Sequence, residues 1–356
     1  MQMVDLLDFA KQYFGKKLPF VLYSKPNQDK IVGLFQDNDE LYFSENLKEM
    51  GFILAPFDGN QQVLIPEDKS EIKVSSFVFE GNNAGNSSVL DNEKGREAFE
   101  DLVQKAIDAI KSNAFQKVVL SRKEIVTVEN LDFAVIFERL LQAYPTAFKY
   151  CWFHPKVGMW MGATPEQLLK ANNQKISTVA LAGTQKYEEN QEVIWGEKEI
   201  EEQKFVTDFI VDNLKDITLK LCVSEPYTLK AGNILHIKTD IEAVLKPECT
   251  LKDVVLILHP TPAVCGFPRA IAKEFILENE GYNREYYSGF LGELNKDFAT
   301  AESKSDLFVN LRCMQIKENQ AHLYIGCGIT KDSIPEKEYI ETVNKSLTMK
   351  RILNSI

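Results

Sequence analysis

Two stretches of this sequence repeat the same spacing of acidic residues. The middle of the chain reads GEKEIEEQKFV and the end reads IPEKEYIETVNK, and each contains Glu-Lys-Glu, two further residues and Glu. Residues three positions apart share a helix face, so Glu199 can point the same way as Glu202, and Glu338 the same way as Glu341. Two such helices could hold a divalent cation between them. Exposed glutamates are also common on surface helices, and the spacing alone leaves both interpretations open.

Ligand chemistry indicates which metal such a site would take. Carboxylate ligation favours magnesium, which typically takes one or two protein carboxylates, several waters and an anionic substrate. The four histidines and six cysteines are scattered and lack the spacings of zinc or redox sites. The sequence therefore favours Mg²⁺ over zinc.

Two further ionisable residues could transfer protons. Lys117 opens the apolar segment KVVLSR, and Glu166 follows Thr-Pro in GATPEQLL. Burial lowers the pKa of a lysine and raises that of a glutamate, so such a pair can act as base and acid. A solvent-facing lysine at a strand end and a first-turn helix glutamate are the plainer alternatives.

Three segments could contact a ligand through their backbone. Gly183-Thr184, in ALAGTQ, follows a β-prone stretch and could offer N–H groups and a hydroxyl to an anion. Gly326 and Gly328, in YIGCGIT, allow close approach of a backbone. The segment LHPTPAVCGFPR is rigid and non-repetitive, and it forms either a pocket wall or a stiff connector. A simple turn is the alternative for both glycine segments.

These residues must be positioned by a mixture of helices and strands. Short apolar runs between charged turns predict several strands in residues 1–80, and an apolar stripe from Phe99 to Ile110 predicts an amphipathic helix. Further helices are predicted at 131–143, 194–215, 268–279 and 335–353, and strands at 117–122, 307–316 and 321–329. Regular β-α alternation is absent from this order, which favours an α+β fold with large, mostly antiparallel sheets covered by helices.

The composition is that of a soluble globular protein. The chain has 356 residues, 44% hydrophobic and 26% charged, with a net charge of −11. This charge argues against nucleic acid or an anionic membrane as partner. The longest aliphatic run, Val254 to Leu258, is too short to span a bilayer. No signal peptide is visible, so we expect a cytoplasmic protein. Such an acidic protein needs local donors or a bridging metal to bind an anion.

Taken together, these segments resemble the chorismate-binding enzymes, in particular the isochorismate synthases. The matching motifs run in the family's order from about residue 95 to the end: FQKVVLSR, GATPEQLL, ALAGTQ, EKEIEEQ, ILHIKTDIEAVL, LHPTPAVCGFPR, YYSGFLGEL, LFVNLRCMQI, YIGCGIT and EKEYIETVNK. Residues 1–90 match no motif, and we expect them to be a strand-rich part of the same domain as the catalytic region, 91–356. Gln185 and Glu285 depart from the family, which commonly has arginine and glycine at these two positions.

The resemblance implies a fold and a metal. The fold would be α+β, with two facing, mostly antiparallel sheet layers, helices outside and the active site between the layers. Mg²⁺ would bridge both acidic helices to the ring carboxylate of chorismate. Glu202 and Glu341 would be direct ligands, and Glu199 and Glu338 would act directly or through water.

The resemblance also implies a reaction, the isomerisation of chorismate to isochorismate. Water adds at C2 and the C4 hydroxyl leaves; Lys117 would be the base and Glu166 the acid. Gly183 and Thr184 would hold the ring carboxylate, and Ala263 would line the pocket. The enolpyruvyl carboxylate would be held by Arg312 and Tyr287, the backbone of Gly326 to Gly328, and Lys345.

Other members of the family remain as alternatives. Lys117 favours water over ammonia as nucleophile, so no amidotransferase subunit is expected. Members of the family are often monomers, and we expect a monomer here. A salicylate synthase, which goes on to eliminate pyruvate, is the first alternative, and Ala263-Val264 favours isochorismate synthase over it. A non-catalytic relative that binds Mg²⁺ or a dicarboxylate is the second. The resemblance places the product in menaquinone or siderophore synthesis.

Overall fold

The computed structural model describes residues 2–81, 95–129, 131–186, 193–231 and 234–353. The helices are α1 (Met3–Gly15), α2 (Arg96–Lys111), α3 (Phe133–Ala143), α4 (Glu197–Leu214), α5 (Leu251–Leu258), α6 (Arg269–Asn279) and α7 (Pro335–Leu353), with short 3-10 turns at Glu67–Lys69 and Lys215–Ile217. Within the described ranges, no helix is both long enough and apolar enough to cross a membrane.

Nine strands of the described chain form the first sheet, and neighbouring strands in it are antiparallel. In spatial order they are β15 (Gly266–Phe267), β7 (Lys117–Thr127), β19 (Gln320–Ile329), β18 (Cys313–Lys317), β9 (Gly158–Thr164), β8 (Phe148–His154), β1 (Phe20–Ser24), β2 (Lys30–Gln36) and β6 (Ser70–Ser76). The pair β7–β19, next to the short edge strand β15, is long and carries Lys117 at one end.

The second sheet is also antiparallel and has ten strands among the described residues. In spatial order they are β12 (Thr218–Val223), β14 (Ile234–Leu245), β11 (Lys175–Lys186), β10 (Gln167–Asn172), β17 (Ser305–Val309), β16 (Phe290–Leu294), β4 (Gly51–Ala55), β5 (Gln62–Pro66) and β3 (Tyr42–Ser44), with β13 (Tyr227–Ala231) also paired to β14. Strands from the first 80 residues therefore belong to both sheets.

The two sheets face each other across a shared aromatic core. Strand β1 reads FVLYS and is buried throughout, because its two faces serve different cores. Phe20 and Leu22 pack toward α1 and α3, whereas Val21 and Tyr23 face the second sheet. The inter-sheet core also contains Phe52, Phe148, Trp152, Trp160, Leu291 and Phe308. The predicted α+β fold with facing sheet layers is confirmed.

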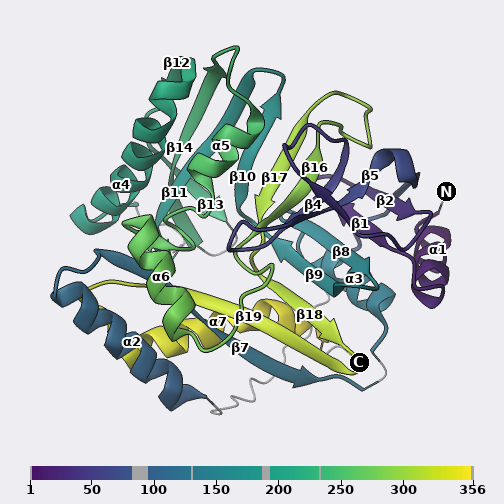
Figure 1. The fold of residues 1–356 in the computed structure, drawn as a ribbon. Coiled ribbons are helices and arrows are strands. Elements are labelled where there is room, and N and C mark those ends of the chain that lie inside the picture. Colours follow the sequence, from purple (N-terminus) through teal and green to yellow (C-terminus); the bar gives the residue numbers. More distant parts are fainter. Residues whose placement is uncertain (1, 82–94, 130, 187–192, 232–233, 354–356) are drawn as a thin grey trace.

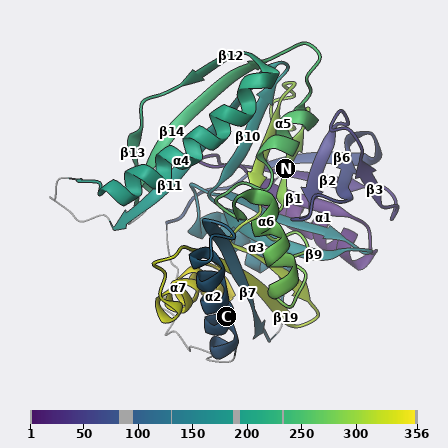
Figure 2. The same ribbon diagram turned by 60° about the vertical axis from the view of Figure 1, so that its left-hand side comes forward.

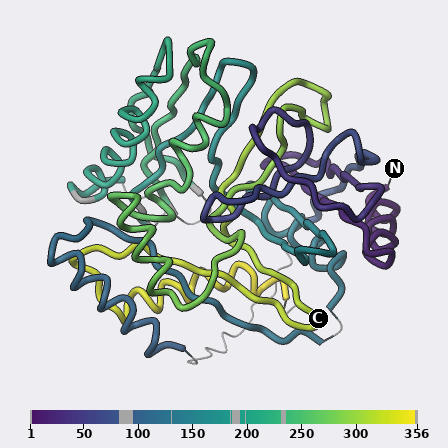
Figure 3. The backbone as a smooth tube through the Cα atoms, in the orientation of Figure 1, coloured from purple at the N-terminus to yellow at the C-terminus, as the bar shows by residue number. Residues whose placement is uncertain are grey.

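Helices cover the outer faces of both sheets (Figure 1). Helix α4 lies along β11 and β14 (Figure 2), where Val206 and Ile210 pack on Ile176 and Ala180. Helix α7 lies against β19 and beside α2, although these helices are far apart in the sequence (Figure 3). The two acidic motifs thus begin two helices on different sheets.

The sequence predicted most helices well but misplaced one strand. The segment 307–316 was expected to be one strand, and this was wrong: it is split between β17 and β18, which belong to different sheets. The chain turns between them, and Arg312 adopts a positive φ of 47°. A left-handed residue that is not glycine leaves little trace in the sequence. Helices α1 and α5 were also not predicted.

Candidate active site

Lys117 and Glu202 meet where strand β7 begins below helix α4. Lys117 Nζ donates a hydrogen bond to Glu202 Oε1 over 2.8 Å. Lys117 pairs with Phe267 of β15 through the backbone, so the strand end is not a free edge. The lysine side chain is 20% exposed and the glutamate side chain 41%. The base predicted from the sequence therefore lies beside one of the predicted metal ligands.

Glu166 occupies the turn between β9 and β10. Its carbonyl accepts a hydrogen bond from the Val309 N–H over 2.9 Å, which fixes the turn to β17. Burial raises the pKa of the Glu166 carboxyl from 4.5 to about 7, although the positive charges of Lys117, Arg312 and Lys345 act in the opposite direction. Three predicted site cations are thus electrostatically coupled to this carboxyl group. A carboxyl with this pKa can donate a proton near neutral pH.

Arg312 and Lys345 form the cationic part of the site. Lys345 Nζ donates to the carbonyl of Gly326 over 3.0 Å and lies 2.6 Å from Glu341 Oε1, one turn earlier on α7. Arg312 Nη1 donates to Thr348 Oγ1 over 3.1 Å. Burial lowers the pKa of Arg312, whereas Tyr287, Glu341 and Glu166 act against that shift. The left-handed turn at Arg312 thus places its guanidinium near Lys345, in the region predicted to bind the enolpyruvyl carboxylate of the substrate.

Gly326 and Gly328 leave room for two predicted site residues. A Cβ on Gly326 would lie 2.6 Å from the Tyr287 hydroxyl and 2.8 Å from the Leu120 carbonyl. A Cβ on Gly328 would lie 3.2 Å from Cε of Lys117. The two glycines therefore permit close approach on strand β19, as their spacing indicated.

Gly183 lies at a bulge in strand β11, under the first turn of α4. Its φ is +70°, and a Cβ there would lie 3.2 Å from Cβ of Glu199. The bulge falls between Ala182 and Thr184, and the side chain of Thr184 lies outside the described part of the structure. The helix with Glu199 and Glu202 thus packs directly on this bulge, because the glycine has no side chain.

Sequence reasoning missed His236, which braces the same bulge from β14. Its Nδ1 lies 3.0 Å from the Gly183 carbonyl oxygen. Burial lowers the pKa of His236; the contact with Gly183 acts against this shift, and the positive charge of Arg312 acts with it. The one sign in the sequence that His236 could belong to the site was its position as the single histidine in the strand-like segment ILHIKTD.

The four predicted metal ligands supply suitable atoms but are not yet gathered around one point. Among the described residues, no group of three or more acidic, histidine or cysteine side chains is already arranged to hold a metal. Burial raises the pKa of Glu338, and the neighbouring charge of Glu341 raises it further. Glu202 and Glu341 are each paired with a lysine. Carboxylate oxygens are the ligands that Mg²⁺ prefers, so the chemistry of these four side chains fits that ion.

Ala263 lies in the turn between α5 and β15, and its role as a pocket-wall residue stays a prediction. Its neighbour Val264 accepts a hydrogen bond at its carbonyl from Arg284 Nη1 over 3.0 Å. Through this contact the loop is linked to the segment that carries Tyr287. The loop is therefore held in place by a hydrogen bond from a buried arginine.

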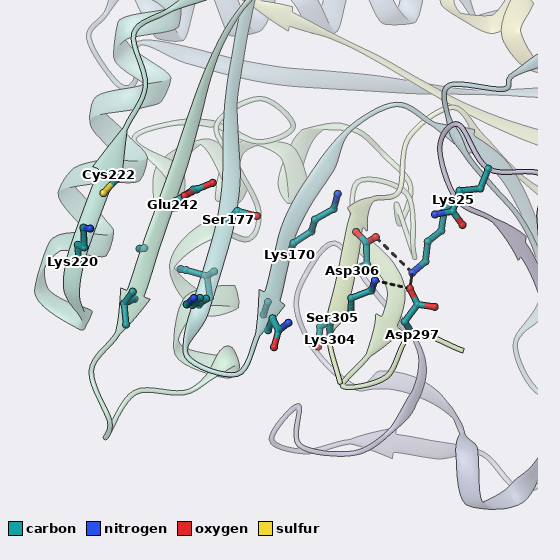
Figure 4. A pocket seen from close by; sticks show the side chains of 17 residues that line it. Lys25, Lys170, Ser177, Lys220, Cys222, Glu242, Asp297, Lys304, Ser305 and Asp306 are labelled. Carbon is teal, nitrogen blue, oxygen red and sulfur yellow. Dashed lines mark hydrogen bonds and ion pairs between the residues drawn. The ribbon is translucent and has the colours of Figure 1, made fainter. Parts of the chain in front are cut away.

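A cavity of about 540 Å³ lies elsewhere, on the second sheet (Figure 4). It is lined by residues of β10, β11, β12 and β14 and by a buried ion-pair group in which Lys25 contacts Asp297 and Asp306. None of the predicted site residues lines it. The candidate active site is therefore identified by its chemistry rather than by cavity volume.

Known proteins share both the sequence pattern and the fold. The family model described as "Chorismate binding enzyme" matches residues 61–354. Isochorismate synthase EntC of Escherichia coli (strain K12) is 29% identical over 345 residues, covering 91% of this chain and 85% of that protein. Anthranilate synthase component 1 of Lactococcus lactis is 28% identical over 344 residues, covering 92% and 71%.

A solved structure supports the same assignment at the level of fold. MenF, the menaquinone-specific isochorismate synthase of Escherichia coli, superposes with a TM-score of 0.77 at 21% identity, covering 94% of this chain and 89% of that one. The family model spans most of the chain, including every candidate residue named above. This chain therefore belongs to the chorismate-binding enzyme family.

Proposed function

We propose that this protein is an isochorismate synthase, an isomerase that converts chorismate to isochorismate in the presence of Mg²⁺. The observation that carries the proposal is the pKa of Glu166, which is raised to about 7 at a carboxyl group on which the positive charge of Lys117 acts. The reaction needs both an acid that is protonated near neutral pH and a base. The name of the E. coli relative, isochorismate synthase EntC, supports the same reaction.

The proposed reaction requires two proton transfers. Lys117 takes a proton from water while the water oxygen bonds to C2 of the ring. The ring double bonds shift, the C4–O bond breaks, and Glu166 gives its proton to the departing hydroxyl, which leaves as water. One water enters and one leaves, so the product has the same composition as chorismate. In the present arrangement Lys117 donates to Glu202 as an ammonium, so it must release Glu202 and lose one proton to solvent before its lone pair can accept a proton from the attacking water.

The cations of the site suit a substrate with two carboxylates. Arg312 and Lys345 lie at the Gly326 end of β19, where Lys345 already bonds a backbone carbonyl. With the Tyr287 hydroxyl beside Gly326, they would hold the enolpyruvyl carboxylate. The Gly183 bulge would face the ring carboxylate. This local set explains how a protein of net charge −11 can bind a dianion.

Glu199, Glu202, Glu338 and Glu341 would hold Mg²⁺. When bound, the ion supplies positive charge to the ring carboxylate of the substrate. Glu202 is tied to Lys117 and Glu341 to Lys345 in the present arrangement, so the same carboxylates connect the metal site to the base and to a substrate-binding cation.

Product analysis tests the proposal. The purified protein is incubated with chorismate and Mg²⁺, and the products are separated by chromatography and identified by mass spectrometry. An isomer of chorismate without pyruvate is the expected result. Salicylate with pyruvate would instead indicate a salicylate synthase, and unchanged chorismate would indicate a binding protein without this activity.

A further inference from the structure

Arg284 is a buried charged residue that the proposed reaction does not use. It lies between α6 and β16, three residues before Tyr287, and its relative exposure is 2%. Its Nε donates to Glu280 Oε2 over 2.8 Å, and Nη2 bonds the other oxygen of the same carboxylate. Burying an arginine is costly unless its donors are satisfied, and Arg284 makes four hydrogen bonds at this position.

The guanidinium reaches the backbone of two other segments. Nη1 donates to the carbonyl of Val264 over 3.0 Å, and Nη2 donates to the carbonyl of Val119 over 2.6 Å. Val119 is two residues after Lys117 on β7, and Val264 directly follows Ala263. One side chain thus joins the strand of the base to the loop of a predicted pocket wall.

Glu280 extends the same link further along strand β7, to the residue that faces β19. Its Oε1 accepts from the Ser121 N–H over 2.7 Å and from Ser121 Oγ over 2.9 Å. Ser121 is the residue opposite Gly326 in the β7–β19 pairing. The ion pair therefore fixes β7 at the point where Gly326 passes the Tyr287 hydroxyl.

Two aromatic rings also contact the guanidinium group. Its central carbon lies 4.4 Å from the ring centroid of Phe57 and 5.7 Å from that of Tyr287. The N–H of Tyr287 in turn donates to the Arg284 carbonyl over 2.9 Å. Moving the guanidinium would therefore also shift the tyrosine that borders the predicted carboxylate site.

We propose that Arg284, held by Glu280, is a positioning residue for the reaction. It sets the distance between the strand that carries Lys117, the loop that carries Ala263 and the ring of Tyr287. The proposal rests on the proposed function, because it concerns the geometry of that reaction. Arginine is required because its planar fork presents five donors at fixed angles, whereas lysine presents three donors at one point. Charge alone cannot replace the fork.

Steady-state kinetics of three variants test this role. Arg284→Lys keeps the charge but loses the fork, and Glu280→Gln weakens the link to Ser121 while keeping Arg284. Lys149→Met is the control, because Lys149 is another buried cation that bonds only two backbone carbonyls, those of Lys25 and Pro145, among its described contacts. Each variant is first checked for wild-type secondary structure and assayed well below its melting temperature.

We expect Arg284→Lys to lower kcat by about 10- to 100-fold with KM changed by less than about threefold, since small misplacements of a reacting group reduce rate more than binding. Glu280→Gln also lowers kcat, but by a smaller factor than Arg284→Lys. If Arg284→Lys does not fold, the kcat of Glu280→Gln tests the positioning role by itself. Lys149→Met keeps the wild-type kcat. A wild-type kcat in the folded Arg284 and Glu280 variants, or an equal loss in Lys149→Met, overturns the positioning role. A wild type that leaves chorismate unchanged overturns the proposed function and this role with it.

Discussion

Lys117 Nζ and Glu202 Oε1 lie 2.8 Å apart, so the predicted base and a predicted metal ligand share a hydrogen bond. Strand β7 belongs to the first sheet, and α4 covers the second. This contact is one place where the two halves of the molecule meet in the candidate site. If Glu202 binds the metal and Lys117 is the base, as proposed, the two roles would be coupled, because the carboxylate cannot serve both partners in the same way.

Replacing Lys117 removes the proposed base. We expect Lys117→Ala to lower kcat by about 10²- to 10⁴-fold, the range typical of general acid–base groups. Mg²⁺ binding, measured by calorimetric titration, should be retained. Lys123→Ala changes an exposed lysine further along the same strand; it is the control and should keep its activity. Full activity in Lys117→Ala would exclude the lysine as base.

The acid role of Glu166 predicts the pH dependence of turnover. Its pKa is raised to about 7, so the proton it must donate is lost as the pH rises through that value. The rate should therefore fall above about pH 7, and Glu166→Gln should be nearly inactive at every pH. Initial rates in overlapping buffers measure this. A wild-type rate that stays level to pH 9 would contradict the assignment.

The same pKa predicts how stability depends on pH. Between the ordinary value of 4.5 and about 7, the folded protein holds the Glu166 proton more tightly than the unfolded chain. Stability from this group is therefore complete below pH 4.5 and is lost as the pH rises to 7, by about 3 kcal/mol at about 1.4 kcal/mol per pKa unit. Denaturant unfolding should show Glu166→Gln gaining stability relative to wild type across this window. Parallel curves for the two proteins would mean that the carboxyl titrates normally.

The acidic helices predict a dependence on Mg²⁺. Chelation should abolish turnover, and Glu202→Gln and Glu341→Gln should each weaken Mg²⁺ binding by at least about tenfold, since even outer residues around a metal change affinity by that much. Glu201→Gln changes an exposed neighbour on the same helix and should bind Mg²⁺ normally. Equal Mg²⁺ affinity in all three variants would remove these glutamates from the metal site.

The two glycines of β19 should respond differently to alanine. Gly326→Ala places a methyl group 2.6 Å from the Tyr287 hydroxyl and 2.8 Å from a carbonyl, and it should cost about 1–3 kcal/mol of stability. Gly328→Ala meets only the flexible side chain of Lys117, with its nearest contact at 3.2 Å, and should lower kcat with little loss of stability. Thermal unfolding and kinetics together distinguish the two. The reverse order of stabilities would refute this account of the glycines.

Much of the fold follows from local patterns in the sequence. The predicted helices 194–215, 268–279 and 335–353 correspond to α4, α6 and α7, because apolar stripes and end signals define helices locally. The break at Arg312 and the left-handed turn at Glu285, whose φ is 50°, could not be predicted from local pattern. At Glu285 the family commonly has glycine, the residue that adopts this φ without strain.

The candidate site, like the fold, was only partly predictable from the sequence. Residue types and helix spacing marked the four glutamates, Lys117 and Glu166 as candidates, and the resemblance to the chorismate-binding enzymes gave them their roles, which stay predictions. The partners that hold them were not visible: Glu280 and Arg284 are joined to Val119 and Val264 by contacts between distant segments. Such contacts depend on how strands are paired, which a single sequence does not display.

Isotope labelling tests the central claim most directly. The protein is incubated with chorismate and Mg²⁺ in water enriched in ¹⁸O, and the isomer formed is analysed by mass spectrometry with fragmentation. Water addition at C2 with loss of the C4 hydroxyl predicts one ¹⁸O atom in each product molecule, at C2. An isomer without the label would show that the hydroxyl moves without exchange and would contradict the roles given to Lys117 and Glu166.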